Sequence, residues 1–99
     1  MSRFEFIQPV RLKDGTEIIG PIEADFARLP TVAVTAGGRT VRIRGSSFGR
    51  AVGGDPPSME MLEEWVNDSV CATPMGDTVE PDGYGPDSCP SWLLLLGMI

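Results

Sequence analysis

The sequence predicts an α+β protein: a small antiparallel sheet or partly open barrel, one amphipathic helix packed on it, and a buried apolar C-terminal segment. Two observations carry this prediction: alternating β-branched runs separated by glycine turns in the first half, and helical periodicity after residue 55. With 99 residues, the chain is expected to form a single domain, 1–99. Residues 1–52 form a β-rich, basic half, and residues 53–99 hold the helix, an acidic loop and the apolar C-terminus.

The first predicted hairpin joins residues 10–13 to residues 16–19 through Asp14-Gly15. An Asp-Gly pair between apolar runs is a strong hairpin signal, because a two-residue turn needs positive φ at both positions. Residues 4–7 alternate weakly and precede it. Gly20-Pro21 is expected to end the hairpin, and residues 23–29 to form one helical turn or an irregular link that stops before Pro30.

A second hairpin is predicted from residues 31–35 and 40–44, with its turn at residues 36–39. The alternation places Val41 and Ile43 on one face of the return strand and Arg42 and Arg44 on the other. The glycine- and serine-rich residues 45–47, and the glycine- and proline-rich residues 53–57, are expected to interrupt regular structure.

A helix is predicted over residues 59–67, capped by Asp55 or Ser58 and ending near Asn67-Asp68. Its spacing separates an apolar stripe from a glutamate stripe; the stripes are Met61, Leu62, Trp65 and Val66, and Glu60, Glu63 and Glu64.

A short third hairpin is expected from residues 70–72 and 78–79, followed by a turn-rich stretch over residues 80–90. Ser91 can cap the run 92–99, which is apolar on all sides and is expected to be buried as a short helix or terminal strand. Trp65 and Trp92 are expected in the core.

Charge is divided unevenly between the halves. Residues 1–50 contain all eight basic side chains and five acids, a net charge of +3, whereas residues 51–99 contain nine acids and no base, a net charge of -9. Such asymmetry points toward charged partners. Two alternatives compete with an interaction: the acids serve solubility, or the arginines neutralise them within the fold.

The sequence lacks the residues that several classes of catalytic and metal-binding site require. The chain has no histidine, so it has no Ser-His or Cys-His pair, and Ser46-Ser47 has no base to activate it. Cys71 and Cys89 are too few for a structural zinc cage. The loop acids Asp77, Glu80, Asp82 and Asp87 do not follow EF-hand spacing. We therefore expect a non-enzymatic protein without metal or cofactor.

The expected location is cytoplasmic. The longest apolar run, residues 92–99, falls far below the roughly 20 residues that a membrane-spanning helix needs. The first residues lack the continuous apolar segment of a secretory signal. In a reducing compartment, Cys71 and Cys89 are expected to be free thiols.

Two binding surfaces follow from the charges. An acidic surface could imitate a phosphate backbone and occupy a basic channel on a partner, with Tyr84 as an exposed anchor; its residues are Glu60, Glu63, Glu64, Asp68, Asp82, Tyr84 and Asp87. The alternative is a nucleic-acid-binding or regulatory module that grips phosphates with the arginines around the second hairpin; these are Arg39, Arg42, Arg44 and Arg50.

The C-terminal third, with Val-Glu-Pro-Asp-Gly at residues 79–83 and Pro-Ser-Trp-Leu-Leu-Leu-Leu-Gly-Met-Ile at residues 90–99, resembles a group of small uncharacterised proteins of phages and plasmids. The resemblance implies a mobile-element setting and no catalytic residues. By analogy of setting, it implies an anti-CRISPR-like inhibitor that binds a host protein complex such as a CRISPR effector.

Overall fold

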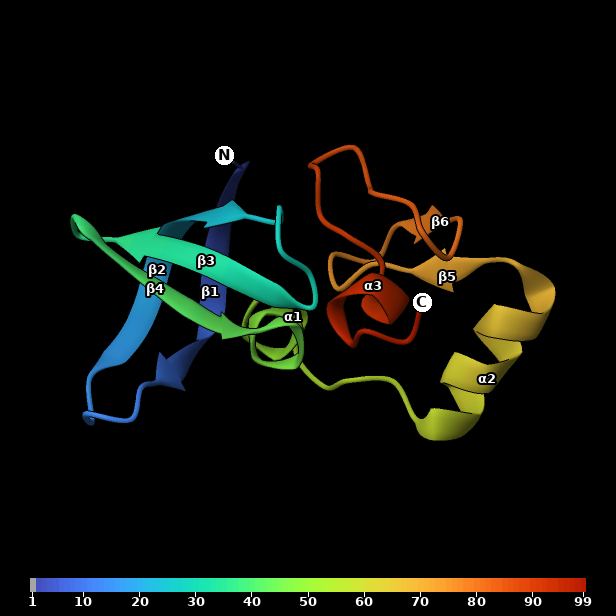
Figure 1. The fold of residues 1–99 in the computed structure, drawn as a ribbon, viewed down its shortest axis with the longest axis horizontal. Helices are drawn as coiled ribbons and strands as arrows, with labels where there is room; N and C mark the ends of the chain where they lie inside the picture. Colours follow the sequence, from blue (N-terminus) through green and yellow to red (C-terminus); the bar gives the residue numbers. More distant parts are fainter. Residues whose placement is uncertain (1) are drawn as a thin grey trace.

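A four-stranded antiparallel sheet forms the first half of the molecule. The computed structural model describes residues 2–99 and shows an α+β fold with no closed barrel, which confirms the predicted class. The strands follow one another across the sheet in chain order (Figure 1). They are β1 (Ser2–Arg11), β2 (Glu17–Asp25), β3 (Thr31–Ala36) and β4 (Arg39–Arg44).

The hairpin between β1 and β2 is present, but its turn differs from the prediction. Leu12 N donates to Thr16 O at 2.7 Å, and Gly15 N donates to Leu12 O at 3.0 Å. Of the two residues expected to have positive φ, only Gly15 does, at +88°. The turn is therefore a three-residue loop ending in a left-handed glycine, the next commonest solution for a hairpin.

Strand β2 does not stop at Gly20-Pro21, contrary to the prediction. It continues to Asp25, with Pro21 opposite Glu5 of β1. Pairing with β3 begins only at Glu23, so the missing N–H of Pro21 does not interrupt that ladder. Residues 26–30 then form an irregular turn that contains a cis Leu29-Pro30 bond.

The second hairpin is confirmed as predicted. Gly37-Gly38 forms its two-residue turn, and the pairing runs from Ala36 opposite Arg39 to Thr31 opposite Arg44. Ile43 is buried, whereas Arg42 and Arg44 are exposed on the other face of β4.

A helix that the sequence did not suggest follows β4 directly. Helix α1 (Gly45–Gly53) occupies the segment that was expected to interrupt regular structure. Phe48 and Val52 are buried against the sheet, where the Phe48 ring meets those of Phe4 and Phe26 edge to face, both at 5.3 Å. The helix that covers the sheet is therefore α1 and not the predicted helix 59–67.

Three glycines on one side of α1 bring the second half of the chain close. At 100° per residue, Gly45, Gly49 and Gly53 share one side of the helix. A Cβ at Gly45 would overlap the carbonyl of Leu95, one at Gly49 the ring of Trp92, and one at Gly53 the carbonyl of Pro74. Helix α1 thus joins the two halves, with apolar side chains toward the sheet and bare backbone toward the C-terminal region.

The second half contains small elements around a small core. These are α2 (Met59–Asp68), β5 (Cys71–Ala72), β6 (Thr78–Val79) and α3 (Trp92–Leu95). The predicted third hairpin is confirmed as β5 paired with β6. Both predicted serine caps are present: Ser58 Oγ accepts from Met61 N, and Ser91 Oγ accepts from Leu94 N, each at 3.2 Å. Cys71 and Cys89 are buried free thiols.

The apolar C-terminal run is only partly buried. Trp92, Leu93 and Leu95 are buried in α3, as predicted for this part of the run. Met98 and Ile99 are exposed, so the expectation that the whole tail is buried was wrong for its end.

The apolar stripe of α2 is mostly exposed, also contrary to expectation. Leu62 is buried and Trp65 is partly buried in a core with Cys71, Trp92 and Leu93. Met61 and Val66 remain 45% and 47% exposed. Helix α2 packs beside β5 and stands at the end of the elongated molecule, which measures 40 × 23 × 21 Å (Figure 1).

Candidate functional site

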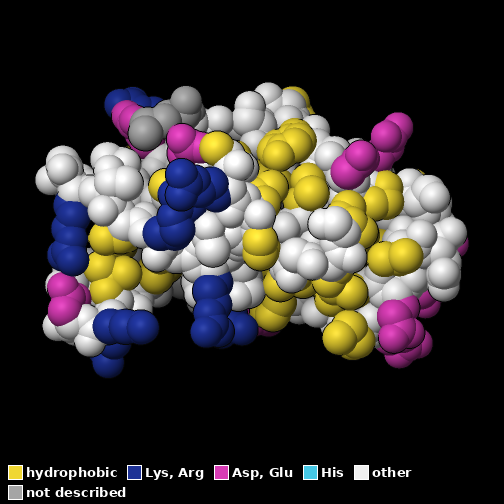
Figure 2. All heavy atoms as spheres, viewed as in Figure 1, with side chains coloured by type: hydrophobic (Ala, Val, Ile, Leu, Met, Phe, Trp, Pro, Cys, Tyr) yellow, Lys and Arg dark blue, Asp and Glu magenta, His cyan; other side chains and the backbone are white. Residues whose placement is uncertain are grey.

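Lysines and arginines lie only in the first half of the chain, whereas acids lie in both halves. In the face drawn in Figure 2, lysines and arginines lie over the sheet half together with some acids, whereas the end that carries α2 shows acids without basic side chains. Three ion pairs occur among residues 2–99, Arg3–Glu23, Arg11–Glu17 and Arg39–Asp14, and all lie within the sheet half. No ion pair in the described chain joins the halves, so neutralisation of the acidic half by contact with the arginines is not observed.

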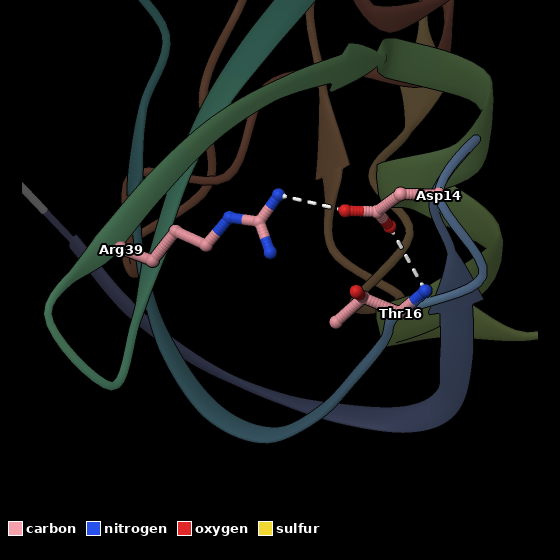
Figure 3. Close-up of polar contacts among 3 residues, drawn as sticks. All are labelled: Asp14, Thr16 and Arg39. Atoms are coloured by element: carbon pink, nitrogen blue, oxygen red, sulfur yellow. Dashed lines mark hydrogen bonds and ion pairs between the residues drawn. The ribbon is translucent and has the colours of Figure 1, made fainter.

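Arg39 is engaged at the turn end of the sheet (Figure 3). Its guanidinium donates to Asp14 Oδ2 at 3.2 Å, while Thr16 N donates to Asp14 Oδ1 at 2.9 Å. The hydrogen bonds from Thr16, followed by that from Arg39, lower the pKa of Asp14 to about 2. This arrangement braces two neighbouring hairpin turns and engages Arg39, whose side chain stays 55% exposed.

The acids of α2 are exposed and have no basic residue near them in sequence. Glu60, Glu63, Glu64 and Asp68 all lie at the surface, and residues 51–99 contain no lysine or arginine. Met59, on the same helix, is 65% exposed, and Met61 and Val66 are about half exposed. The helix therefore presents carboxylates interspersed with apolar side chains, a composition suited to contact with another macromolecule.

The other predicted acidic residues lie in a separate place. Asp82, Tyr84 and Asp87 belong to the loop between β6 and α3, which runs on the opposite side of β5 from α2 (Figure 1). Tyr84 is 49% exposed. Asp87 Oδ1 accepts from Cys89 N at 3.1 Å, so this carboxylate also shapes the loop. The predicted surface is thus divided into a helical part and a loop part.

An apolar groove of about 450 Å³ adjoins the start of α2. Pro56, Pro57 and Met59 line one part of it, and Leu96 and Met98 line another. Arg50 and Ser46 of α1 also border this groove. The apolar surface formed by the exposed methionines of α2 therefore continues along this groove toward α1.

A second cavity, of about 250 Å³, lies between β1, the end of β4 and α1. It brings together Arg44 and Arg50, two of the four predicted arginines, and adds Arg11 from β1. Arg42 is exposed on β4 and donates to Thr31 Oγ1 at 3.0 Å. Sequence reasoning missed Arg11, because nothing in the pattern indicates that the end of β1 lies beside the start of α1.

The buried cysteine beside the acidic loop is poorly suited to nucleophilic chemistry. Burial, and then the charge of Asp87, raises the pKa of the Cys89 thiol to about 12. The thiolate is the reactive form, so little of this group is reactive at neutral pH. Within residues 2–99, no group of three histidine, cysteine or acidic residues is placed to hold a metal ion.

Comparison with known proteins assigns no family to this chain. The chain matches no protein-family model, no curated protein and no solved structure. Among residues 2–99, no helix has both the length and the apolar character needed to cross a membrane.

Proposed function

We propose that this protein is a non-enzymatic binding protein that docks the α2 end of the molecule onto a basic surface of a partner protein. The observation that carries the proposal is the composition of the exposed part of α2, where acids are interspersed with exposed methionines and a valine. Leu62 is buried, and Trp65 is partly buried in the small core. The exposed side chains on the rest of the helix are available to a partner.

The energetics of α2 favour such a role. Full burial of a methionine or valine side chain contributes roughly 1.5–3 kcal/mol. Met59, Met61 and Val66 are exposed in the isolated chain, so their burial by a partner would stabilise the complex. Glu60 and Glu64 lie one helical turn apart, where like charges cost a few tenths of a kcal/mol. A basic, partly apolar partner surface would bury these apolar side chains and relieve this repulsion.

The partner we propose is a host complex that handles nucleic acid, such as a CRISPR effector, which the protein would inhibit by occupying a basic channel. The net charge of -9 on residues 51–99 supports imitation of a polyanion. The resemblance of residues 79–83 and 90–99 to mobile-element proteins supports the anti-defence setting. Electrostatic docking of this kind speeds association and weakens with salt.

The test is affinity capture with the tagged protein from a bacterial lysate that contains active CRISPR effector complexes, with and without nuclease, at low and high salt. The informative variant is Glu60→Gln/Glu64→Gln, which removes two charges without removing helix-forming side chains. The matched control is Glu5→Gln/Glu23→Gln, which removes the same charge from the sheet half.

The proposal expects a stoichiometric protein partner that survives nuclease, is lost at high salt, and is captured much less by the α2 variant than by the control. Met61→Ser/Val66→Ser should weaken capture as well, since both side chains are exposed in the free protein. Equal capture by the α2 variant and the control, or recovery of nucleic acid alone, contradicts the proposal.

A further inference from the structure

Three arginines from distant parts of the chain converge on the cavity between β1, β4 and α1. Arg11 comes from the end of β1, Arg44 from the end of β4 and Arg50 from α1. No aspartate or glutamate is among the described residues that line this cavity. Like charges gathered without a counter-charge repel one another, so the arrangement favours an anion between them.

The charges of these arginines are largely uncompensated. Within residues 2–99, Arg44 and Arg50 form no ion pair, and Arg11 approaches Glu17 only at 3.9 Å, with 74% of the Arg11 side chain exposed. An exposed pair at this distance contributes little. All three guanidiniums are therefore available to a ligand.

The first turn of α1 opens on the same cavity and adds donors. Arg44 provides no side-chain cap, and Gly45 N donates a hydrogen bond to Pro30 O at 2.7 Å. Ser46 and Ser47 line the cavity, and neither hydroxyl has a hydrogen-bond partner in the described chain. Their backbone N–H groups belong to the first turn, which has no intrahelical acceptor and carries the positive end of the helix dipole.

The backbone explains why these groups meet. On α1, Ser46 and Arg50 are four residues apart and share one side, and side chains lean toward the start of a helix. On β1, the register with β2 shifts between Phe6 and Val10, so residues 7–9 stand opposite Ile19 alone. Such a bulge bends a strand, and here its Gln8 and Pro9 form a wall of the cavity.

We propose that this cavity binds a phosphate group, held by Arg11, Arg44 and Arg50 together with the first turn of α1. Guanidiniums and free helix N–H groups are the donors that phosphate prefers in proteins. No aromatic side chain is among the described residues that line the cavity, so these residues offer no platform on which a base could stack. Recognition is therefore directed at the phosphate and is independent of base sequence.

The phosphate can belong to a polynucleotide or to a small phosphorylated molecule. Arg42 lies two residues before Arg44 on the same exposed face of β4, about 7 Å away along the strand. It could meet a neighbouring phosphate of a polynucleotide. The acidic end does not prevent binding, because the molecule is 40 Å long and charges are screened over about 8 Å at physiological ionic strength.

The experiment uses the full chain and two probes: a fluorescein-labelled 12-nucleotide oligodeoxythymidine, read by anisotropy at about 0.1 M salt, where charges are screened over about 10 Å, and thymidine monophosphate as its competitor. The variant Arg44→Ala/Arg50→Ala is compared with Arg3→Ala/Arg28→Ala, which removes the same charge at exposed positions outside the cavity. Thermal melting of both double variants checks that each is folded.

We expect Arg44→Ala/Arg50→Ala to weaken binding by at least about tenfold, because two charge-assisted hydrogen-bond donors are lost. The slope of log affinity against log salt should fall by about 1.4 for two lost single-strand contacts. The control should change affinity much less. Glu17→Gln should tighten binding slightly, since it removes a negative charge 3.9 Å from Arg11.

The two probes separate the sources of phosphate. Much tighter binding of the oligonucleotide than of the monophosphate, with the same arginine dependence, assigns a polynucleotide backbone. Comparable binding of the two assigns a small phosphorylated ligand. The proposal is overturned if neither probe binds at about 0.1 M salt, or if both double variants weaken binding equally while remaining folded.

Discussion

The sheet half and the C-terminal half of this molecule are stabilised in different ways. In the sheet half, strands of six to ten residues pair along a continuous meander, and a cluster of phenylalanines fills the space beneath α1. In the C-terminal half, the strands have two residues each, and four buried residues form the core. Backbone pairing organises the first half, whereas burial of a few side chains organises the second.

The halves also differ in how they treat charge. Arg39 and Asp14 lock two turns of the sheet half together, whereas the described acids of α2 face solvent. In the sheet half, some charged side chains form ion pairs with one another, and three arginines line a cavity. In the C-terminal half, the described acids of α2 lie at the surface. Helix α1 connects the two halves, because one side of it packs on the sheet and another contacts the C-terminal region.

The largest expected effect is on the small core. Leu93 is fully buried there, and Leu93→Ala should lower the free energy of unfolding by about 2–5 kcal/mol. Urea denaturation gives the total loss, and amide hydrogen exchange should show that protection falls in the C-terminal half before the sheet. Met61→Ala, on exposed α2, is the control and should stay within about 0.5 kcal/mol. Uniform loss of protection would show that the halves do not differ in stability.

An intermediate effect is expected where the halves meet. Alanine is the better helix former by about 1 kcal/mol, but a Cβ at Gly49 would overlap the Trp92 ring. Overpacking costs about 1–3 kcal/mol, so Gly49→Ala should destabilise the protein in urea denaturation. Ser47→Ala, outside the glycine side of α1, should be neutral or slightly stabilising. If Gly49→Ala instead stabilised the protein, the close contact between the halves would be disproved.

The smallest effect is expected at the contact between Asp14 and Arg39, which joins two turns of the sheet half. The hydrogen bonds from Thr16 and Arg39 lower the pKa of Asp14 from 3.8 to about 2. The stability they contribute is complete above pH 4 and disappears as the pH falls toward 2. Asp14→Asn should therefore be less stable than wild type near pH 6, with the difference shrinking at pH 2, as measured by thermal melting. A difference independent of pH would mean that the carboxylate charge is not involved.

Much of the local structure was predictable because its signals are local. Gly37-Gly38 between alternating strands defined the second hairpin, and Ser58 before a periodic segment defined α2. The third hairpin and the cap at Ser91 were found in the same way. Each of these features depends on residues within one or two turns of the chain, where propensity and hydrogen bonding act directly.

The sequence by itself therefore determined the α+β class, most of the hairpins and the unequal division of charge. Only the tertiary structure decided that α1 exists, since a segment with glycine at 45, 49 and 53 has weak helix propensity and is stabilised by burial of Phe48 and Val52. It likewise left α2 exposed and brought Arg11 to Arg44 and Arg50. The physical reason is that helix formation and the meeting of like charges here depend on contacts between residues far apart in the chain.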